Sequence, residues 1–460
     1  MAGRKTPAFR TVVDSRVESV HTVRTGTADG SRIRLTPYDL LTGPWYTPLT
    51  FFYRGTLDGA ALRDSLARTL RRYPLLAGRL LRDADGGLSV LCNDAGVRFT
   101  EASCPEPMRE YGHLLRAQPV VGDVLREVSP LGVVARDTPL LKIRLTRMRG
   151  GGSVLGVLVN HSLADGGSAL AFLESWSREH LGLPWEEPSH DRGALEALGR
   201  LSDRPQTRDD RAFAGVSRTR RLLSTLRPGL RRRATVSTRF GAAELAAMKS
   251  EALQALTDPG DWVSTNDVLT AHLWRVLAEL RGHPDEAAQW LGLVVGAQSV
   301  LGDALPSSYW GNCVTKSWTS LPAGELRGRP LGAVAGDVRR CLRSNTEDKL
   351  RDEIAFLGTW RRRGVSRHVM SVRALDVSEA SLSVNNWSRF PLYRIDFGAG
   401  RPFWYEFPDL PVPTVHIAPT PREDGGRDVY LCLSEPHADL VRSSRWQERL
   451  HPHAVPGLAA

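Results

Sequence analysis

The chain has 460 residues, of which 41% are hydrophobic and 24% charged, ordinary values for a soluble globular protein with one or more large cores. No apolar run is long enough to span a bilayer, and the first ten residues lack the apolar stretch of a secretory signal. The five cysteines include no CxxC pair, which argues against a disulfide framework and against a cysteine metal site. We therefore expect a cytoplasmic protein with reduced thiols and no metal.

The net charge of +10 favours phosphorylated ligands, nucleic acid or membranes as partners. Positive charge is densest at residues 218–233, which contain seven arginines and no aromatic side chain. Without aromatic rings the segment offers no stacking surface for a single strand. A solvated basic loop is the simplest interpretation, and a phosphate-binding segment is the second. We expect neither nucleic acid nor a membrane as a partner.

The first half of the chain predicts mixed α/β structure. Apolar residues recur every three or four positions after Asp58, which can cap a helix that ends at Pro74. The nearly unbroken apolar run at 154–159 is typical of a strand buried on both faces. The predicted elements are strands at 49–53, 140–148 and 154–159, a hairpin at 80–92, and helices at 58–73 and 168–180.

From residue 182 to about 233 the periodicity is lost, and proline, arginine and acidic residues increase. We interpret this stretch as a connection with one short helix near 194–201. Regular patterns then return, with strands predicted at 235–240, 291–297 and 429–433 and helices at 242–253 and 264–280. The expected organisation is an N-terminal domain at 1–190, a crossover linker at 191–233, and a C-terminal domain at 234–460.

The segment that carries the most chemical information runs from Asn160 to Gly167, with the sequence NHSLADGG. It lies between a predicted buried strand and a predicted helix, a junction where clefts form at the rim of a sheet. His161 is the only one of the twelve histidines that is followed by aspartate four positions later, here Asp165. An imidazole has an unperturbed pKa near 6.5, so it can accept a proton at neutral pH. On the residues alone, a buried core histidine beside a helix-capping aspartate remains an open alternative.

Other chemistries have less support in the sequence. No metal-ligand cluster accompanies His161, and no G-x-S-x-G nucleophile elbow occurs. A Walker phosphate loop and a dinucleotide-binding G-x-G-x-x-G are also missing.

At this point the motifs resemble those of a known family. The segment Asn160–Gly166 is similar to the HxxxDG motif of the BAHD acyltransferases, and Asp396-Phe397-Gly398-Ala399-Gly400 is similar to their DFGWG signature. Weaker similarities at 73–79, 264–274 and Gly311-Asn312 extend the resemblance over nearly the whole chain. The arginine- and alanine-rich composition resembles microbial rather than plant members, which favours a role in secondary metabolism.

The resemblance implies an α/β fold of two similar chloramphenicol-acetyltransferase-like domains. Each would be a mixed β-sheet with flanking helices, and the active-site channel would lie at their interface. It further implies acyl-coenzyme A as a co-substrate, no permanently bound cofactor, and a small-molecule acceptor with a hydroxyl or amine. We expect a monomer.

The resemblance also implies roles for single residues. His161 would be the general base, and Asp165 would point away from the cleft and pair with an arginine. The structural support of the active site would come from Asp165, Gly166, Asp396, Gly398 and Gly400. Oxyanion or substrate contacts are expected from the Gly166 N–H and from polar groups near Asn312 or Thr315.

Two departures from the family pattern change these expectations. Ala399 replaces the tryptophan of DFGWG, and the strand at 293–297 lacks the arginine that usually pairs with the DFG aspartate. We therefore expect Arg394 or Arg401 as the partner of Asp396. Lys316 and the arginines at 231–233 are candidates for the coenzyme A phosphates.

Two alternatives to a coenzyme A-dependent enzyme follow from the same motifs. Condensation domains share the fold but use a carrier-protein thioester and an HHxxxDG motif. Asn160 stands in place of the first histidine, and this, with the DFG segment, favours free coenzyme A. A non-catalytic binding protein of the same fold is the other alternative, and the intact His161 and glycines argue against it.

Overall fold

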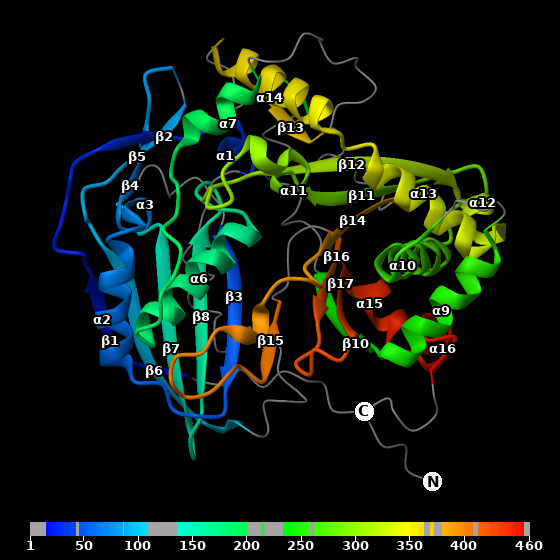
Figure 1. Cartoon of the computed structure of the whole chain (residues 1–460). Coiled ribbons are helices and arrows are strands. Elements are labelled where there is room, and N and C mark those ends of the chain that lie inside the picture. Colours follow the sequence, from blue (N-terminus) through cyan, green and yellow to red (C-terminus); the bar gives the residue numbers. More distant parts are fainter. Residues whose placement is uncertain are drawn as a thin grey trace.

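Two six-stranded β-sheets form the centre of the molecule, one in each half (Figure 1). The computed structural model describes residues 15–42, 46–85, 87–108, 137–199, 213–215, 217, 233–256, 262–362, 369–371, 380–407 and 413–454. Both sheets are mixed, because β6 and β7 pair in parallel in the first and β14 pairs in parallel with two neighbours in the second. The α/β fold of two sheets with flanking helices, expected from the resemblance, is confirmed.

The first sheet is built almost entirely from the N-terminal half. Its edge strand β15 is the exception, since it comes from the C-terminal half and pairs with β3 (orange beside blue in Figure 1). Helices α2 (Gly59–Leu70) and α6 (Gly166–His180) cover the sheet with their apolar sides. In spatial order the strands are β1 (Arg16–Val23), β6 (Val97–Pro107), β7 (Leu141–Arg149), β8 (Ser153–Asn160), β3 (Tyr46–Tyr53) and β15 (Trp404–Glu406).

The second sheet is built from the C-terminal half, and its helices pack around α10 on one face. In spatial order its strands are β10 (Arg233–Phe240), β17 (Arg427–Ser434), β16 (Thr414–Pro419), β14 (Ser381–Asn386), β11 (Ala288–Gly296) and β12 (Val314–Pro322). Its helices are α9 (Ala242–Gln254), α10 (Thr265–Arg281), α12 (Ala323–Gly328), α13 (Leu331–Arg343), α15 (Glu435–Val441) and α16 (Ser444–Leu450).

A third apolar cluster lies between the two sheets, at the top of Figure 1. It contains Leu195 of α7 and Leu350 of α14, so part of the expected linker packs against the C-terminal half. The elements around it are α1 (Pro37–Thr42), α7 (Arg192–Gly199), α11 (Gln298–Leu301), η3 (Gly302–Ala304), α14 (Glu347–Arg362) and the β9–β13 pair (Phe213–Gly215, Val369–Ser371). The domain limits at 190 and 233 stay a prediction.

The predicted strands, helices and hairpin are confirmed to within a few residues. The apolar run at 154–159 is β8, which is buried along its whole length, and the hairpin is formed by β4 and β5. The short helix expected at 194–201 is α7, which begins two residues earlier. The elements not yet placed are β2 (Arg32–Arg34), β4 (Arg79–Arg82) and β5 (Leu88–Leu91), which form a small sheet, with α3 (Pro74–Ala77) and η5 (Leu392–Arg394).

Candidate active site between the two sheets

His161 directly follows the last residue of β8. The chain turns there, with the Ser162 N–H donating to Oδ1 of Asn160 at 3.1 Å, and α6 begins at Gly166. His161 itself is only partly buried. The buried strand and the helix therefore hold the imidazole at the end of the first sheet, where part of it stays accessible.

Asn312, which precedes β12, orients the ring of His161 across the interface. Its Oδ1 lies 3.2 Å from Nδ1 of His161, while its Nδ2 donates to the His161 carbonyl at 2.7 Å and to Asp39 at 2.9 Å. Both neighbours of Nδ2 are acceptors, so the amide cannot be reversed without losing both bonds. Oδ1 then accepts the proton of Nδ1, and Nε2 keeps its lone pair. Both amide hydrogens are used, so the expected oxyanion contact from Asn312 does not fit its hydrogen bonds.

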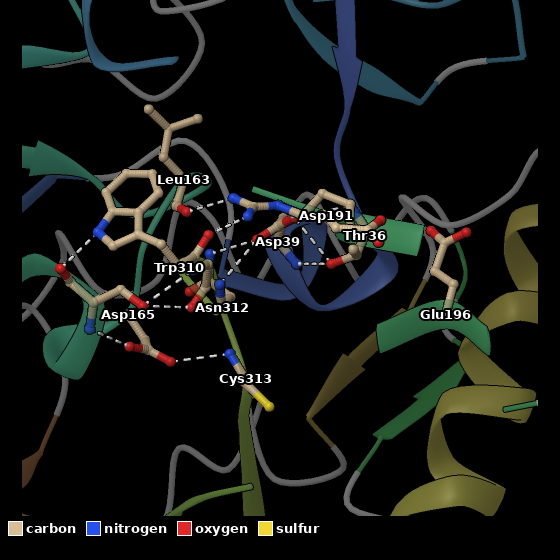
Figure 2. Close-up of polar contacts among 12 residues, drawn as sticks. Thr36, Asp39, Leu163, Asp165, Asp191, Glu196, Trp310, Asn312 and Cys313 are labelled. Atoms are coloured by element: carbon tan, nitrogen blue, oxygen red, sulfur yellow. Dashed lines mark hydrogen bonds and ion pairs between the residues drawn. The ribbon is translucent and has the colours of Figure 1, made fainter. Parts of the chain in front are cut away.

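Asp39 of α1 holds Asn312 in place (Figure 2). Its Oδ1 accepts from both the backbone N–H and the side chain of Asn312, at 3.1 and 2.9 Å. Its Oδ2 accepts from the backbone and hydroxyl of Thr36 at 2.8 and 2.9 Å, and from Arg192 at 3.1 Å. The carboxylate is fully buried and accepts from these five donors. It therefore places a negative charge near His161, with Asn312 between the two side chains.

Arg192, the first residue of α7, ties this carboxylate to both halves of the molecule. It pairs with Asp39 and donates to the carbonyl of Trp310. It also donates at 2.9 Å to the carbonyl of Leu163 in residues 161–165, which we call the histidine loop. Gly311 is required beside it, since a Cβ there would lie 2.5 Å from the guanidinium. One buried side chain thus joins α1, the histidine loop and the segment before β12.

Asp165 braces the histidine loop, but not in the way the resemblance implied. Its Oδ1 caps α6 by accepting from the Ser168 N–H, and its Oδ2 accepts from the Cys313 N–H, both at 2.9 Å (Figure 2). Burial raises the pKa of this carboxyl. The expected arginine partner is corrected, because the described residues place no arginine in an ion pair with Asp165 and the nearby Arg192 pairs with Asp39.

Gly166 lies under the indole of Trp387. A Cβ at this position would come 2.2 Å from Cζ2 of Trp387, whereas a Cβ at Gly167 would meet nothing closer than 3.4 Å. The first of the two glycines is therefore required by packing against the second half of the molecule.

The DFG segment packs on the far end of α6. The Ser177 hydroxyl donates to the Asp396 carbonyl at 2.6 Å, and the ring of Phe397 lies 4.6 Å from that of Trp176. Ser177 is twelve residues beyond Asp165, so this contact lies about 18 Å along the helix from the histidine loop.

The side chain of Asp396 closes its own turn. Its Oδ1 accepts from the Gly398 N–H at 2.8 Å, while Arg394 pairs with Glu423. The expected Arg394 or Arg401 partner is corrected, since the described residues show neither in an ion pair with Asp396. Gly398 and Gly400 have φ values of 81° and 88°, which only glycine adopts without strain.

Thr315 points toward the helix side of the second sheet. Its hydroxyl donates to Glu353 of α14 at 3.0 Å, and Tyr38 donates to the other carboxylate oxygen at 2.5 Å. Burial raises the pKa of Glu353 to about 7. With its hydroxyl engaged there, Thr315 does not supply the oxyanion contact expected of it.

The motifs did not identify Asp39, Arg192 or Trp387. The one local signal was Thr36 three residues before Asp39, the spacing of a residue that caps a helix start. Among the phosphate candidates, Arg231 and Arg232 lie outside the described residues and Arg233 begins β10.

The described part of the chain contains no group of three or more histidine, cysteine, aspartate or glutamate side chains placed to hold a metal ion. No helix within the described ranges has both the length and the apolar character needed to cross a membrane.

Comparison with known proteins shows the family to which the chain belongs. A model of the Transferase family matches residues 22–449. The hydroxycinnamoyltransferase of Narcissus pseudonarcissus is 29% identical over 381 residues, covering 80% of this chain and 84% of the relative. The shikimate O-hydroxycinnamoyltransferase of Nicotiana tabacum is 27% identical over 415 residues, covering 87% of this chain and 92% of the relative.

Among solved structures, TRI101 of F. graminearum in complex with coenzyme A and T-2 mycotoxin superimposes with a TM-score of 0.72 at 18% identity. The match covers 91% of this chain and 98% of that one, so the two share a fold over nearly their full lengths. With the family model spanning most of its length, the chain belongs to the BAHD acyltransferases and is an acyltransferase.

Proposed function

We propose that the protein transfers an acyl group from a coenzyme A thioester to a hydroxyl or amine of a small molecule, with Nε2 of His161 as the general base. The observation that supports this most directly is the contact of Asn312 Oδ1 with Nδ1 of His161 at 3.2 Å. With Nδ1 engaged as a donor, Nε2 carries the lone pair that can accept a proton.

In this reaction Nε2 takes the proton of the acceptor as its oxygen or nitrogen bonds to the thioester carbonyl carbon. The resulting tetrahedral intermediate collapses, the C–S bond breaks, and the imidazolium returns its proton to the leaving thiolate. The products are an ester or amide and free coenzyme A. Asn312 keeps accepting the Nδ1 proton throughout, and Asp39 behind it offsets the positive charge of the imidazolium.

The oxyanion of the intermediate requires fixed hydrogen-bond donors. Of the three expected donors, Asn312 and Thr315 have their hydrogens engaged elsewhere. We infer that the Gly166 N–H remains the donor, since the first N–H groups of a helix have no intrahelical acceptor. The positive end of α6 adds to this stabilisation.

The test is a thiol-release assay on purified protein with a panel of acyl-coenzyme A donors and hydroxyl- and amine-bearing acceptors. Hydroxycinnamoyl-coenzyme A is the first donor to test, since the two curated relatives are named for hydroxycinnamoyl transfer. His161→Ala is expected to lower kcat roughly 100- to 10,000-fold, the usual contribution of a general base. His180→Ala, at the other end of α6, serves as the matched control and should keep its activity.

The same assay separates the alternatives. Near wild-type turnover by His161→Ala would refute the assignment of the base. Turnover with acylated carrier proteins but not with acyl-coenzyme A would replace the donor with a carrier-bound thioester. Tight ligand binding without turnover over the whole panel would indicate a binding protein.

A further inference from the structure

The second sheet has one face away from its helices. On β12, Thr315 and Ser317 point to the helix side, where they bond to Glu353 and Asn345. Lys316 and Trp318 alternate with them, so they lie on the opposite face.

The register of the strands shows which part of the molecule this opposite face packs toward. Trp318 pairs with Gly292 of β11, and Gly292 pairs with Ser383 of β14. Ser383 pairs with Thr414 of β16, which in turn pairs with Cys432 of β17. Tyr430, two residues from Cys432, therefore shares the face, and it belongs to the apolar core of the first half. The face that carries Lys316 thus turns toward the first half of the molecule, the side on which His161 lies.

Lys316 is a cation in this face for which the described residues supply no counter-charge. It is only partly accessible, and its Nζ lies 4.8 Å from the centroid of the Trp318 ring. The described residues give it no ion pair and no hydrogen bond, and burial lowers the pKa of its ammonium to about 8. A partly dehydrated ammonium with only an aromatic ring beside it favours binding an anion.

Trp318 supplies a second donor without an acceptor. Its ring packs against Gly292, where a Cβ would come 2.6 Å from Cζ3. The buried indole Nε1 finds no hydrogen-bond acceptor among the described residues. Buried donors are rarely left unpaired, and here the indole N–H and the neighbouring ammonium both lack an acceptor among the described residues.

We propose that Lys316, held over Trp318, binds a carboxylate carried by the acceptor. The inference rests on the acyl-transfer function proposed above. Lys316 is four residues beyond Asn312, roughly 13 Å along an extended chain, a span that the lysine side chain and a small acceptor bridge together. A single ammonium also matches the single charge of a carboxylate better than the several charges of the coenzyme A phosphates.

The experiment measures binding by titration calorimetry, so that it does not depend on turnover. The ligands are shikimate, anthranilate, their methyl esters, and coenzyme A. Wild-type protein is expected to bind at least one free acid about tenfold or more tightly than its ester, as for a charge-assisted hydrogen bond. Lys316→Met should abolish this difference and leave the Kd of coenzyme A within about twofold.

The chain offers a matched control. Lys249 of α9 lies over Trp262 with Nζ 5.8 Å from the ring centroid, so Lys249→Met removes the same charge from the same kind of pair elsewhere. It should preserve the preference for the acid. Lys316→Arg should retain most of that preference, and Trp318→Phe should weaken it severalfold by removing only the indole donor.

The outcomes are distinct. Weaker coenzyme A binding by Lys316→Met, with unchanged acid binding, would reassign the lysine to a phosphate. Acids bound no more tightly than their esters by the wild type would also overturn the proposal. His161→Ala should lose turnover but keep the preference for the acid, so a failure of the acyl-transfer proposal can be told apart from a failure of this one.

Discussion

Asn312 orients the ring of His161 through one hydrogen bond. Asn312→Ala removes the acceptor of the Nδ1 proton and lets the ring rotate and change tautomer. The hydrogen bond supports a group that becomes charged, so about 1.5–3 kcal/mol is at stake, roughly a 10- to 100-fold fall in kcat. The KM for acyl-coenzyme A should change little, because Asn312 has no free hydrogen for the donor substrate. Steady-state kinetics with the donor varied gives both values.

The control for this variant is another buried asparagine of the same half. Asn345 accepts a hydrogen bond from Ser317 at 2.6 Å on the helix side of β12. Asn345→Ala should lower the unfolding free energy by a similar amount but leave kcat unchanged. Equal kcat losses in the two variants would show that Asn312 acts only through stability.

The two glycines after Asp165 make a second test at the scale of single residues. Gly166→Ala forces a Cβ to within 2.2 Å of the Trp387 ring, so the indole or the histidine loop must shift. We expect a loss of about 1–3 kcal/mol in unfolding free energy, as for overpacking, together with a clear fall in kcat. Gly167→Ala meets no contact shorter than 3.4 Å and should be nearly neutral. Denaturant unfolding and steady-state kinetics on both variants test this expectation. Equal losses of unfolding free energy and kcat in the two variants would contradict the packing role of Gly166.

At the scale of elements, Arg192 joins α7 and α1 to the loops on both sides of the site. Arg192→Lys keeps the charge next to Asp39, but one ammonium cannot reach Asp39 and the carbonyls of Leu163 and Trp310 together. Each buried acceptor left unpaired costs about 1–3 kcal/mol, so the unfolding free energy should fall by a similar amount or more. The kcat should fall too, since the histidine loop loses its anchor at Leu163.

An arginine–aspartate ion pair with a half-exposed arginine provides the comparison for this change. Arg239 donates twice to Asp428, at 2.7 and 3.0 Å, at an edge of the second sheet. Arg239→Lys should cost less than Arg192→Lys, because Arg239 is half exposed and its partner is reached by a single ammonium. Should Arg192→Lys prove as mild as Arg239→Lys, the linking role of Arg192 would be excluded.

At the scale of the whole molecule, buried histidines make stability depend on pH. Burial lowers the pKa of His190 and His272 to about 4 and that of His416 to about 3. In the unfolded chain these rings bind protons below about pH 6.5, whereas the folded state keeps them neutral, so stability falls as pH drops below 6.5. Each should contribute a loss of roughly 1 kcal/mol between pH 6.5 and 5.5. Glu353, with its raised pKa, acts in the opposite direction over pH 7 to 4.5.

His416→Phe isolates one of these contributions. Both ring nitrogens of His416 are buried and find no hydrogen-bond partner in the part of the chain that the structure describes, and the ring stacks on Phe407 at 3.9 Å. The variant should therefore have nearly the same unfolding free energy as the wild type at pH 7.5. Between pH 7.5 and 5.5 its unfolding free energy should fall by about 1 kcal/mol less than that of the wild type. Urea unfolding at the two pH values is the measurement. An unchanged pH dependence in the variant would count against a neutral His416.

Local pattern was enough to predict much of the fold. The apolar run of β8 and the periodicity of α2, α6 and α10 each depend on neighbouring residues, so they are readable without tertiary information. The positions of His161 and of the DFG turn followed from the motifs in the same way. Strand β15 was not predicted, since three residues carry too little periodicity and their partner β3 lies about 350 positions earlier in the chain.

The partners of the site residues were the least predictable part. Among the described residues, no arginine pairs with Asp165 or Asp396 as expected. Backbone N–H groups donate to these two carboxylates instead. A backbone donor is present at every position and leaves no mark in the side-chain sequence. Which of them lies within reach depends on how the segment before β12 and the DFG turn pack against α6.

By itself, the sequence determined where the histidine sits, at the junction of a buried strand and a helix, because these features depend on residues a few positions apart. The tertiary structure alone decided which side chain contacts Nδ1 of that ring. The contact of His161 with Asn312 spans 151 positions, and that of Asn312 with Asp39 spans 273. Such contacts form only when the two sheets pack together, and no periodicity along the chain encodes them.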